Sequence, residues 1–135
     1  MSLSNFAELE ILDHIFGVGA WTPGTLYMCL CTADPTDAGT GAAMNEVTDA
    51  GAYARVDISG CFGTAAAAGT ISNDAAITFP EATDSWGTVT HFAICDSDTH
   101  GAGNMVLHGA LTQSKTISSG DTPRFSIGEF DLAAD

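Results

Sequence analysis

The sequence predicts a mainly β protein, a single-domain antiparallel β-sandwich or barrel with one short N-terminal α-helix. Its 135 residues suit one domain with one hydrophobic core. Short segments of alternating apolar and polar residues, rich in β-branched and aromatic types, are separated by clusters of Gly, Asp, Asn, Ser and Pro. A content of 15 glycines with only 15% charged residues is typical of a compact, turn-rich chain.

The predicted helix lies within residues 1–18. In the segment "SNFAELEILDHIF" at 4–16, apolar side chains recur at intervals of three and four residues, which is the period of an amphipathic helix. Ser4 is placed to act as the N-cap, and Glu8 and Glu10 lie near the positive end of the helix dipole. The glycines that follow this segment are expected to end the helix.

Residues 19–135 are predicted to form the β domain. Seven segments have the alternation and composition of short strands: 25–32, 52–59, 76–79, 88–95, 104–111, 115–118 and 124–132. Several such strands after a single helix indicate a sandwich or barrel rather than a parallel α/β fold. The polar, Gly-rich segment 34–51 and the low-complexity segment 63–70 are expected to be surface loops.

The same alternation predicts the core. The expected core residues are Leu26, Met28, Leu30, Val56, Ile58, Ile77, Phe79, Phe92, Ile94, Val106, Leu107, Phe125, Ile127 and Phe130. In segment 88–95, Val89 and His91 are expected on one face and Phe92 on the other. Neither face is cleanly polar, so we expect this strand to be covered on both sides. Trp86, just before it, is expected to pack as a buried aromatic anchor.

The charge of the chain is strongly negative, with 17 acidic residues against three basic ones and a formal net charge of −14. The basic residues are Arg55, Lys115 and Arg124. Nucleic acid and anionic membrane surfaces are therefore poor partners, because both are bound through several Lys or Arg side chains. No signal-peptide pattern and no apolar run of the roughly 20 residues that span a bilayer is present, so we expect a protein kept soluble in a cytoplasm.

The four cysteines are expected to be reduced and mostly buried. Cys29, Cys31, Cys61 and Cys95 follow neither a CxxC motif nor the dense spacing of a disulfide-rich scaffold. A zinc site is the alternative, and it would combine Cys29 and Cys31 with Cys61, Cys95 or His91 from other strands.

The stretch "DSWGTVTHFAICDSDTHGAG" at 84–103 contains the residue types of a metal or hydrolytic site. Asp96, Asp98 and Asn104 offer oxygen ligands for calcium in the 96–104 loop, but their spacing is not that of an EF-hand. The chain has neither a GxSxG nor an HExxH motif. We therefore interpret the stretch as a central strand and its turn, and we expect no enzymatic activity, no cofactor and no metal site.

Four segments resemble a family of small bacteriophage virion structural proteins. They are "TLYMCLCTADPTDAG" at 25–39, "AYAR" at 52–55, "WGTVTHFAICD" at 86–96 and "SKTISSGD" at 114–121. Proteins of this type are labelled as capsid decoration (cement) proteins or as tail-fibre proteins. The resemblance implies a structural component of the virion that is assembled in the host cytoplasm.

Three functions compete for this sequence. The first is a capsid decoration protein that forms a homo-oligomer, expected to be a trimer, and bridges capsomers by binding the major capsid protein or another virion protein. The alternative is a tail-fibre or baseplate module that binds a host surface glycan through exposed aromatic residues, for which the chain offers Trp21, Tyr27, Tyr53 and Trp86. The third, a metal-dependent enzyme, would use His91, Asp96, His108 and the cysteines.

The candidate interface combines the helix with two of the few cations. Its residues are Phe6, Leu9, Ile11, Leu12, Ile15, Phe16, Trp21, Arg55 and Arg124. The helix offers more apolar surface than one side of a short helix needs to pack on its own domain, and segment 34–51 would supply a polar rim. The alternative is that the whole helix caps one open end of its own sandwich.

Overall fold

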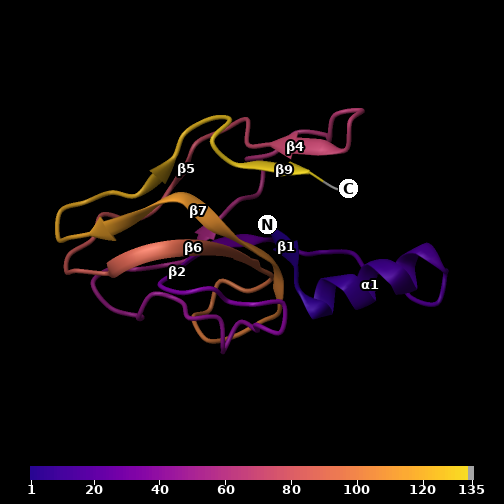
Figure 1. Cartoon of the computed structure of the whole chain (residues 1–135), viewed down its shortest axis with the longest axis horizontal. Coiled ribbons are helices and arrows are strands. Elements are labelled where there is room, and N and C mark those ends of the chain that lie inside the picture. Colours follow the sequence, from indigo (N-terminus) through magenta and orange to yellow (C-terminus); the bar gives the residue numbers. More distant parts are fainter. Residues whose placement is uncertain (134–135) are drawn as a thin grey trace.

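The computed structural model describes residues 1–133. The last two residues of the predicted single domain over 1–135 lie outside the described range. Within this range the chain forms one α-helix and nine strands, and every strand pair is antiparallel (Figure 1). In chain order the elements are β1 (Ser2–Leu3), α1 (Asn5–Ile15), β2 (Tyr27–Cys31), β3 (Val56–Asp57), β4 (Thr70–Ser72), β5 (Ile77–Thr78), β6 (Gly87–Cys95), β7 (Met105–Ile117), β8 (Arg124–Phe125) and β9 (Asp131–Ala133). The predicted class, mainly β with antiparallel strands and one short N-terminal helix, is confirmed.

The strands form one large and two small sheets. The large sheet has five strands in the order β1-β7-β6-β2-β3, and the small sheets pair β4 with β9 and β5 with β8. Figure 1 shows the small sheets on one side of the long strands β6 and β7, while α1 projects from one end of the molecule. Apolar side chains from both layers pack together, which is consistent with the predicted sandwich.

The long strands of the large sheet lie where the sequence predicts them. Segment 25–32 contains β2, and segment 88–95 lies within β6. The predicted strands 104–111 and 115–118 are one strand, β7, because the backbone remains extended beside β6 through the polar residues between them. The separation into two strands is therefore wrong, although the polar residues mark a real irregularity.

The shorter strands differ more from the prediction. Segment 124–132 is divided into β8 and β9 by a turn in which the Glu129 N–H donates to the Ser126 carbonyl (3.1 Å). Segment 52–59 contains only the two paired residues of β3. The sequence does not predict β1 or β4, because two or three residues carry too little alternation and depend on pairing with β7 and β9.

A register shift in β6 changes the face on which one predicted residue packs. Val89 pairs with Lys115, but His91 pairs with Ala110, so residues 111–114 of β7 lie opposite a single residue of β6. Such an irregularity re-aims the side chains next to it. Val89 accordingly packs in the same core cluster as Phe92, and the expectation that Val89 shares a face with His91 is wrong.

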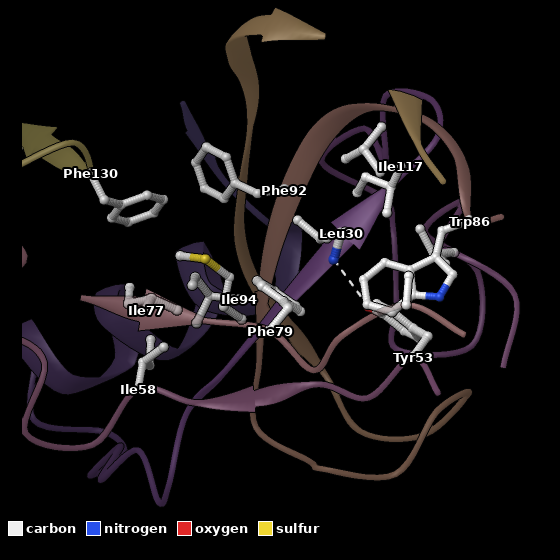
Figure 2. Close-up of a cluster of buried hydrophobic side chains, with 14 residues drawn as sticks. Leu30, Tyr53, Ile58, Ile77, Phe79, Trp86, Phe92, Ile94, Ile117 and Phe130 are labelled. Atoms are coloured by element: carbon white, nitrogen blue, oxygen red, sulfur yellow. Dashed lines mark hydrogen bonds between the residues drawn. The ribbon is translucent and has the colours of Figure 1, made fainter. Parts of the chain in front are cut away.

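The main core lies between the large sheet and the small ones (Figure 2). Phe92 packs edge to face against Phe130 with ring centroids 4.6 Å apart, and Tyr53 does the same against Trp86 at 5.2 Å. Trp86 is buried, as predicted, and its Nε1–H donates to the Gly51 carbonyl (2.8 Å). A Cβ on Gly51 would lie 3.2 Å from that indole nitrogen, so glycine lets the loop approach the ring closely.

Most of the predicted core is confirmed. The buried members are Met28, Leu30, Ile58, Ile77, Phe79, Phe92, Ile94, Val106 and Phe130. The members half-buried against this core are Leu26, Val56, Leu107 and Phe125. Ile127 is wrong, with 66% of its surface exposed, because it lies in the turn between β8 and β9.

The other face of the large sheet is covered by the segment 34–51. This segment returns along β2, with the Val47 N–H donating to the Leu30 carbonyl (2.9 Å). Met44 is buried in the cluster on this face and Val47 is buried in the main core, so the expectation of a purely exposed loop is wrong for this part of the segment. The structure thus explains why both faces of β6 are apolar in sequence: each is covered by another layer.

Ser4 anchors the helix to the sheet. Its hydroxyl accepts from the Ala7 N–H (3.2 Å), which confirms the predicted N-cap, and it also donates to the Met105 carbonyl. The next N–H, that of Asn5, donates to the Asp37 carbonyl (2.8 Å). These bonds hold the first turn against β7 and the 34–51 segment, whereas the later turns extend away from the sheet in Figure 1.

Replacing Phe92 with Ala should lower the free energy of unfolding by about 3–5 kcal/mol, because the ring is buried and the cavity would be only partly refilled. Urea denaturation measures this change. Ile127→Ala is the matched control, expected to change stability by less than about 0.5 kcal/mol because that side chain is exposed. Equal losses in the two variants would contradict the assigned core.

Candidate functional site

Arg55, a candidate interface residue, lies inside the molecule. Its side chain is fully buried and every N–H of the guanidinium has an acceptor. Glu46 accepts two of these bonds, from Nε (2.9 Å) and from Nη2 (2.8 Å). The carbonyls of Ser97, Ala102 and Gly41 accept the others at 2.8, 2.9 and 3.0 Å. Arg55 therefore has no donor left for a partner protein.

Glu46 is shared between Arg55 and a buried tyrosine. The Tyr53 hydroxyl donates to Glu46 Oε1 (2.8 Å) and accepts from the Leu30 N–H (3.1 Å). Burial by itself would lower the pKa of Arg55, but its hydrogen bond to Glu46 and the electrostatic effect of nearby acidic groups together outweigh burial, and the pKa is raised. Burial also raises the pKa of Tyr53, which keeps the phenol protonated as a donor. The ion pair and its neighbours are thus a satisfied polar centre within the core.

This polar centre holds two loops together. A Cβ on Gly41 would lie 2.0 Å from the Ala102 carbonyl oxygen, so only glycine fits where the 34–51 segment meets the 96–104 turn. The turn is closed by Asp96, whose two carboxylate oxygens accept from the Asn104 N–H (2.6 Å) and the Asn104 side-chain amide (2.9 Å). The proposed calcium ligands Asp96 and Asn104 therefore bind each other in this turn.

Two of the histidines hold the 34–51 segment in place. His108 is buried, with Nε2 at 3.0 Å from an Asp37 carboxylate oxygen, and this hydrogen bond lowers the pKa of Asp37. His100 Nε2 donates to the Val47 carbonyl (2.9 Å), and His91 Nδ1 lies 2.8 Å from the hydroxyl of its neighbour Thr90. Within residues 1–133, no three His, Cys, Asp or Glu side chains are grouped so that they could hold a metal ion.

The cysteines are free thiols, and three of them share one cluster. Cys29, Cys31 and Cys95 are buried together with Met44 and Met105, on the face of the sheet opposite the main core. Burial raises the pKa of the Cys29 and Cys31 thiols, which favours the unreactive protonated form. Their predicted burial is confirmed, while Cys61 is only half-buried.

The helix α1 presents an apolar surface to solvent. Its exposed apolar stripe consists of Leu9, Leu12, Ile15 and the C-cap Phe16, whose surfaces are 66%, 52%, 67% and 77% exposed. Ala7 is the buried residue of the helix, so α1 packs on its domain only near its base. The hypothesis that the whole helix caps its own sandwich is therefore wrong. No helix among the described residues is long and apolar enough to cross a membrane.

The remaining candidate interface residues differ in how far their side chains are exposed. Phe6 and Ile11 are half-buried at the side of the helix that faces the domain. Trp21 is half-buried and packs edge to face against Phe6, with ring centroids 6.2 Å apart. Arg124 is exposed, as an interface residue requires.

A second surface feature, which the sequence did not predict, is an open groove of about 630 Å³ beside the C-terminal half of β7. Leu111 and Phe125 contribute apolar surface to it, and Lys115 and Arg124 line it as well. We call it the cationic groove, because it contains both basic residues that remain after Arg55 is buried. The two cations are nine residues apart in sequence, on β7 and on β8, and β8 is paired with β5 rather than with β7.

The carboxylates of the groove are occupied by local hydrogen bonds. Asp121 accepts from the Ser118 N–H (2.8 Å), and Glu129 accepts from the Ser126 N–H, so each closes its own turn. Among residues 1–133, no carboxylate lies within the 4.0 Å of an ion pair from Lys115 or Arg124. Both carboxylates remain charged, so the groove contains two unpaired cations and two carboxylates held in their own turns, beside apolar surface.

Comparison with known protein families identifies a match over residues 2–133. The matching family is described as "Podophage GP4 fiber I protein gp80". No curated protein matches the sequence. The matched range includes the exposed helix, the buried ion pair and the cationic groove.

Replacing Arg55 with Ala should lower the free energy of unfolding by about 3–5 kcal/mol, because Glu46 would be left buried without its counter-charge. Urea denaturation at neutral pH measures the loss. The matched control is Arg124→Ala, expected to change stability by less than about 0.5 kcal/mol. A loss below 1 kcal/mol for Arg55→Ala would show that the ion pair does not support the fold.

Iodoacetamide should modify Cys61 before the other three cysteines in the folded protein at pH 8. The reason is that Cys29, Cys31 and Cys95 are buried, and the thiolate is the reactive form. Peptide mass spectrometry after short labelling times measures the order, and labelling in urea should reach all four. Cys61→Ser should remove the early labelling. Equally rapid modification of Cys31 would contradict the buried sulfur cluster.

Proposed function

Since the chain belongs to the family described as podophage GP4 fiber I protein gp80, we propose that it is a non-enzymatic structural subunit of a phage fibre. Membership in this family makes it a bacteriophage virion structural protein. We propose further that the subunit attaches to a neighbouring virion protein through α1, and that this assembly takes place in the host cytoplasm.

The main support for this proposal is the exposed apolar stripe of α1. Leu9, Leu12, Ile15 and Phe16 are each more than half exposed, although they stand on an ordered, capped helix. Burying one such side chain contributes about 1.5–3 kcal/mol relative to leaving it exposed. A contiguous stripe of this kind is typical of a protein interaction site, and it resembles the way an amphipathic helix enters a groove of its partner.

The family supports a fibre rather than a capsid decoration protein. The small size and the lack of catalytic motifs, which suggested a cement protein, are equally compatible with a fibre subunit. Copy number separates the two locations: stained gels of purified virions should show a fibre subunit in tens of copies and a cement protein in hundreds.

Glycan binding by exposed aromatic residues has little support. Tyr53 and Trp86 are buried in the core and their polar atoms are bonded within the chain. Tyr27 and Trp21 are half-buried and belong to different parts of the molecule. The satisfied histidines and acidic residues likewise favour a structural protein over a metal-dependent enzyme.

Replacing Ile15 with Glu should reduce incorporation of the protein into virions at least tenfold, because the charge would enter the apolar contact of α1. Incorporation is measured by complementing a phage that lacks the gene and quantifying the protein in purified particles. Ile127→Glu is the matched control, since Ile127 is equally exposed (66% against 67%) but lies outside the helix. Normal incorporation of Ile15→Glu would show that α1 is not the attachment element.

A further inference from the structure

We propose that α1 of one copy of this protein docks into the cationic groove of the next copy, so that subunits associate head to tail. This inference rests on the proposed attachment role of α1 and adds the identity of its partner. It joins the two surface features that the fold leaves without an internal partner, the apolar stripe and the groove.

The helix carries negative charge beside its apolar stripe. Successive residues of an α-helix are separated by about 100°, from 3.6 residues per turn. On this basis Leu9, Leu12, Ile15 and Phe16 occupy one arc of about 120°, Glu8 lies within that arc and Asp13 lies next to it. Both acidic residues are exposed. The partner that fits this face therefore needs apolar surface together with positive charge.

The cationic groove has this combination. Leu111 and Phe125 supply apolar surface, and Lys115 and Arg124 are cations without an ion-pair partner in residues 1–133. The two carboxylates that also line the groove are held by backbone N–H groups of their own turns, which leaves the two cations free to pair with the acidic residues of a docked helix. The chain has three Lys and Arg residues and the third, Arg55, is buried, so no other surface of residues 1–133 offers a Lys or Arg side chain. A volume of about 630 Å³ is within the range of sites that bind sizeable ligands.

The positions of the two features require a contact between different copies. Figure 1 shows α1 at one end of the long axis, while the C-terminal end of β7, beside which the groove lies, is at the other. A helix anchored through Ser4 to the opposite end of β7 cannot reach the groove of its own chain. A contact between unlike surfaces of identical subunits is heterologous, and its repetition produces a closed ring or an extended filament.

The net charge keeps each single contact weak. Two chains of net charge −14 repel each other, and a helix of eleven residues, about 16 Å long, buries less surface than a standard stable interface. We therefore expect association that depends on protein concentration in solution and becomes stable through repetition in the virion.

Charge reversal on each side of the contact tests the proposal. The helix variant combines Glu8→Lys with Asp13→Lys, and the groove variant combines Lys115→Glu with Arg124→Glu. Each variant alone should associate about tenfold more weakly than the wild type, because side chains of like charge then replace the proposed pairs between the acidic residues of the helix and the two cations of the groove. An equimolar mixture should regain association, since the positive helix of the first variant faces the negative groove of the second.

Sedimentation velocity over a range of concentrations measures association in each sample, and circular dichroism confirms that each variant is folded. The matched control combines Asp49→Lys with Asp98→Lys, exposed acidic residues that belong neither to the helix nor to the groove lining, and has the same net charge as the helix variant. This control should associate like the wild type. The head-to-tail contact is supported if association is recovered in the mixture and in neither variant by itself.

Two outcomes overturn the proposal. The first is a wild-type chain that remains monomeric at every concentration, and the second is a mixture that associates no better than its separate variants. Either result combined with loss of virion incorporation by Ile15→Glu would leave α1 as an attachment element with a different partner. Normal incorporation of Ile15→Glu would instead remove the attachment role of α1 itself.

Discussion

The buried ion pair between Arg55 and Glu46 is the interaction on which the rest of the structure depends. A buried guanidinium is tolerated only when its charge is balanced and its donors are satisfied, and here the carbonyls of two loops complete the set. The 34–51 segment and the 96–104 turn must therefore occupy fixed positions relative to β2 and β6. With those loops in place, the second face of the large sheet is covered and the sulfur-rich cluster is sealed.

The same ion pair determines the charge distribution of the surface. A chain with three basic residues places one of them in the interior, and the fold brings the other two to a single groove. The rest of the exterior is acidic or neutral. An acidic surface discourages non-specific association, because like charges repel. A contact that needs a Lys or Arg side chain is therefore directed to this groove.

The helix has a separate relation to the fold. Ser4 satisfies the first turn and joins it to β7, which fixes the direction of α1 without burying most of its apolar residues. An ordered helix pays little conformational entropy when it binds, so its exposed side chains are available as a preformed contact surface. This arrangement suits a subunit of a repeated structure, in which stability comes from neighbours as well as from the core.

The sequence by itself determined the fold class, the N-cap of the helix, the long strands β2 and β6, and most of the core, because these follow from local periodicity and capping chemistry. It also identified the helix residues as an interface candidate. Only the tertiary structure decided which faces Val89 and Ile127 present, because a register shift and a turn interrupt the alternation. It alone placed Arg55 inside the molecule and brought Lys115 and Arg124 into one groove, since those positions depend on strand pairing and loop packing between residues far apart in sequence.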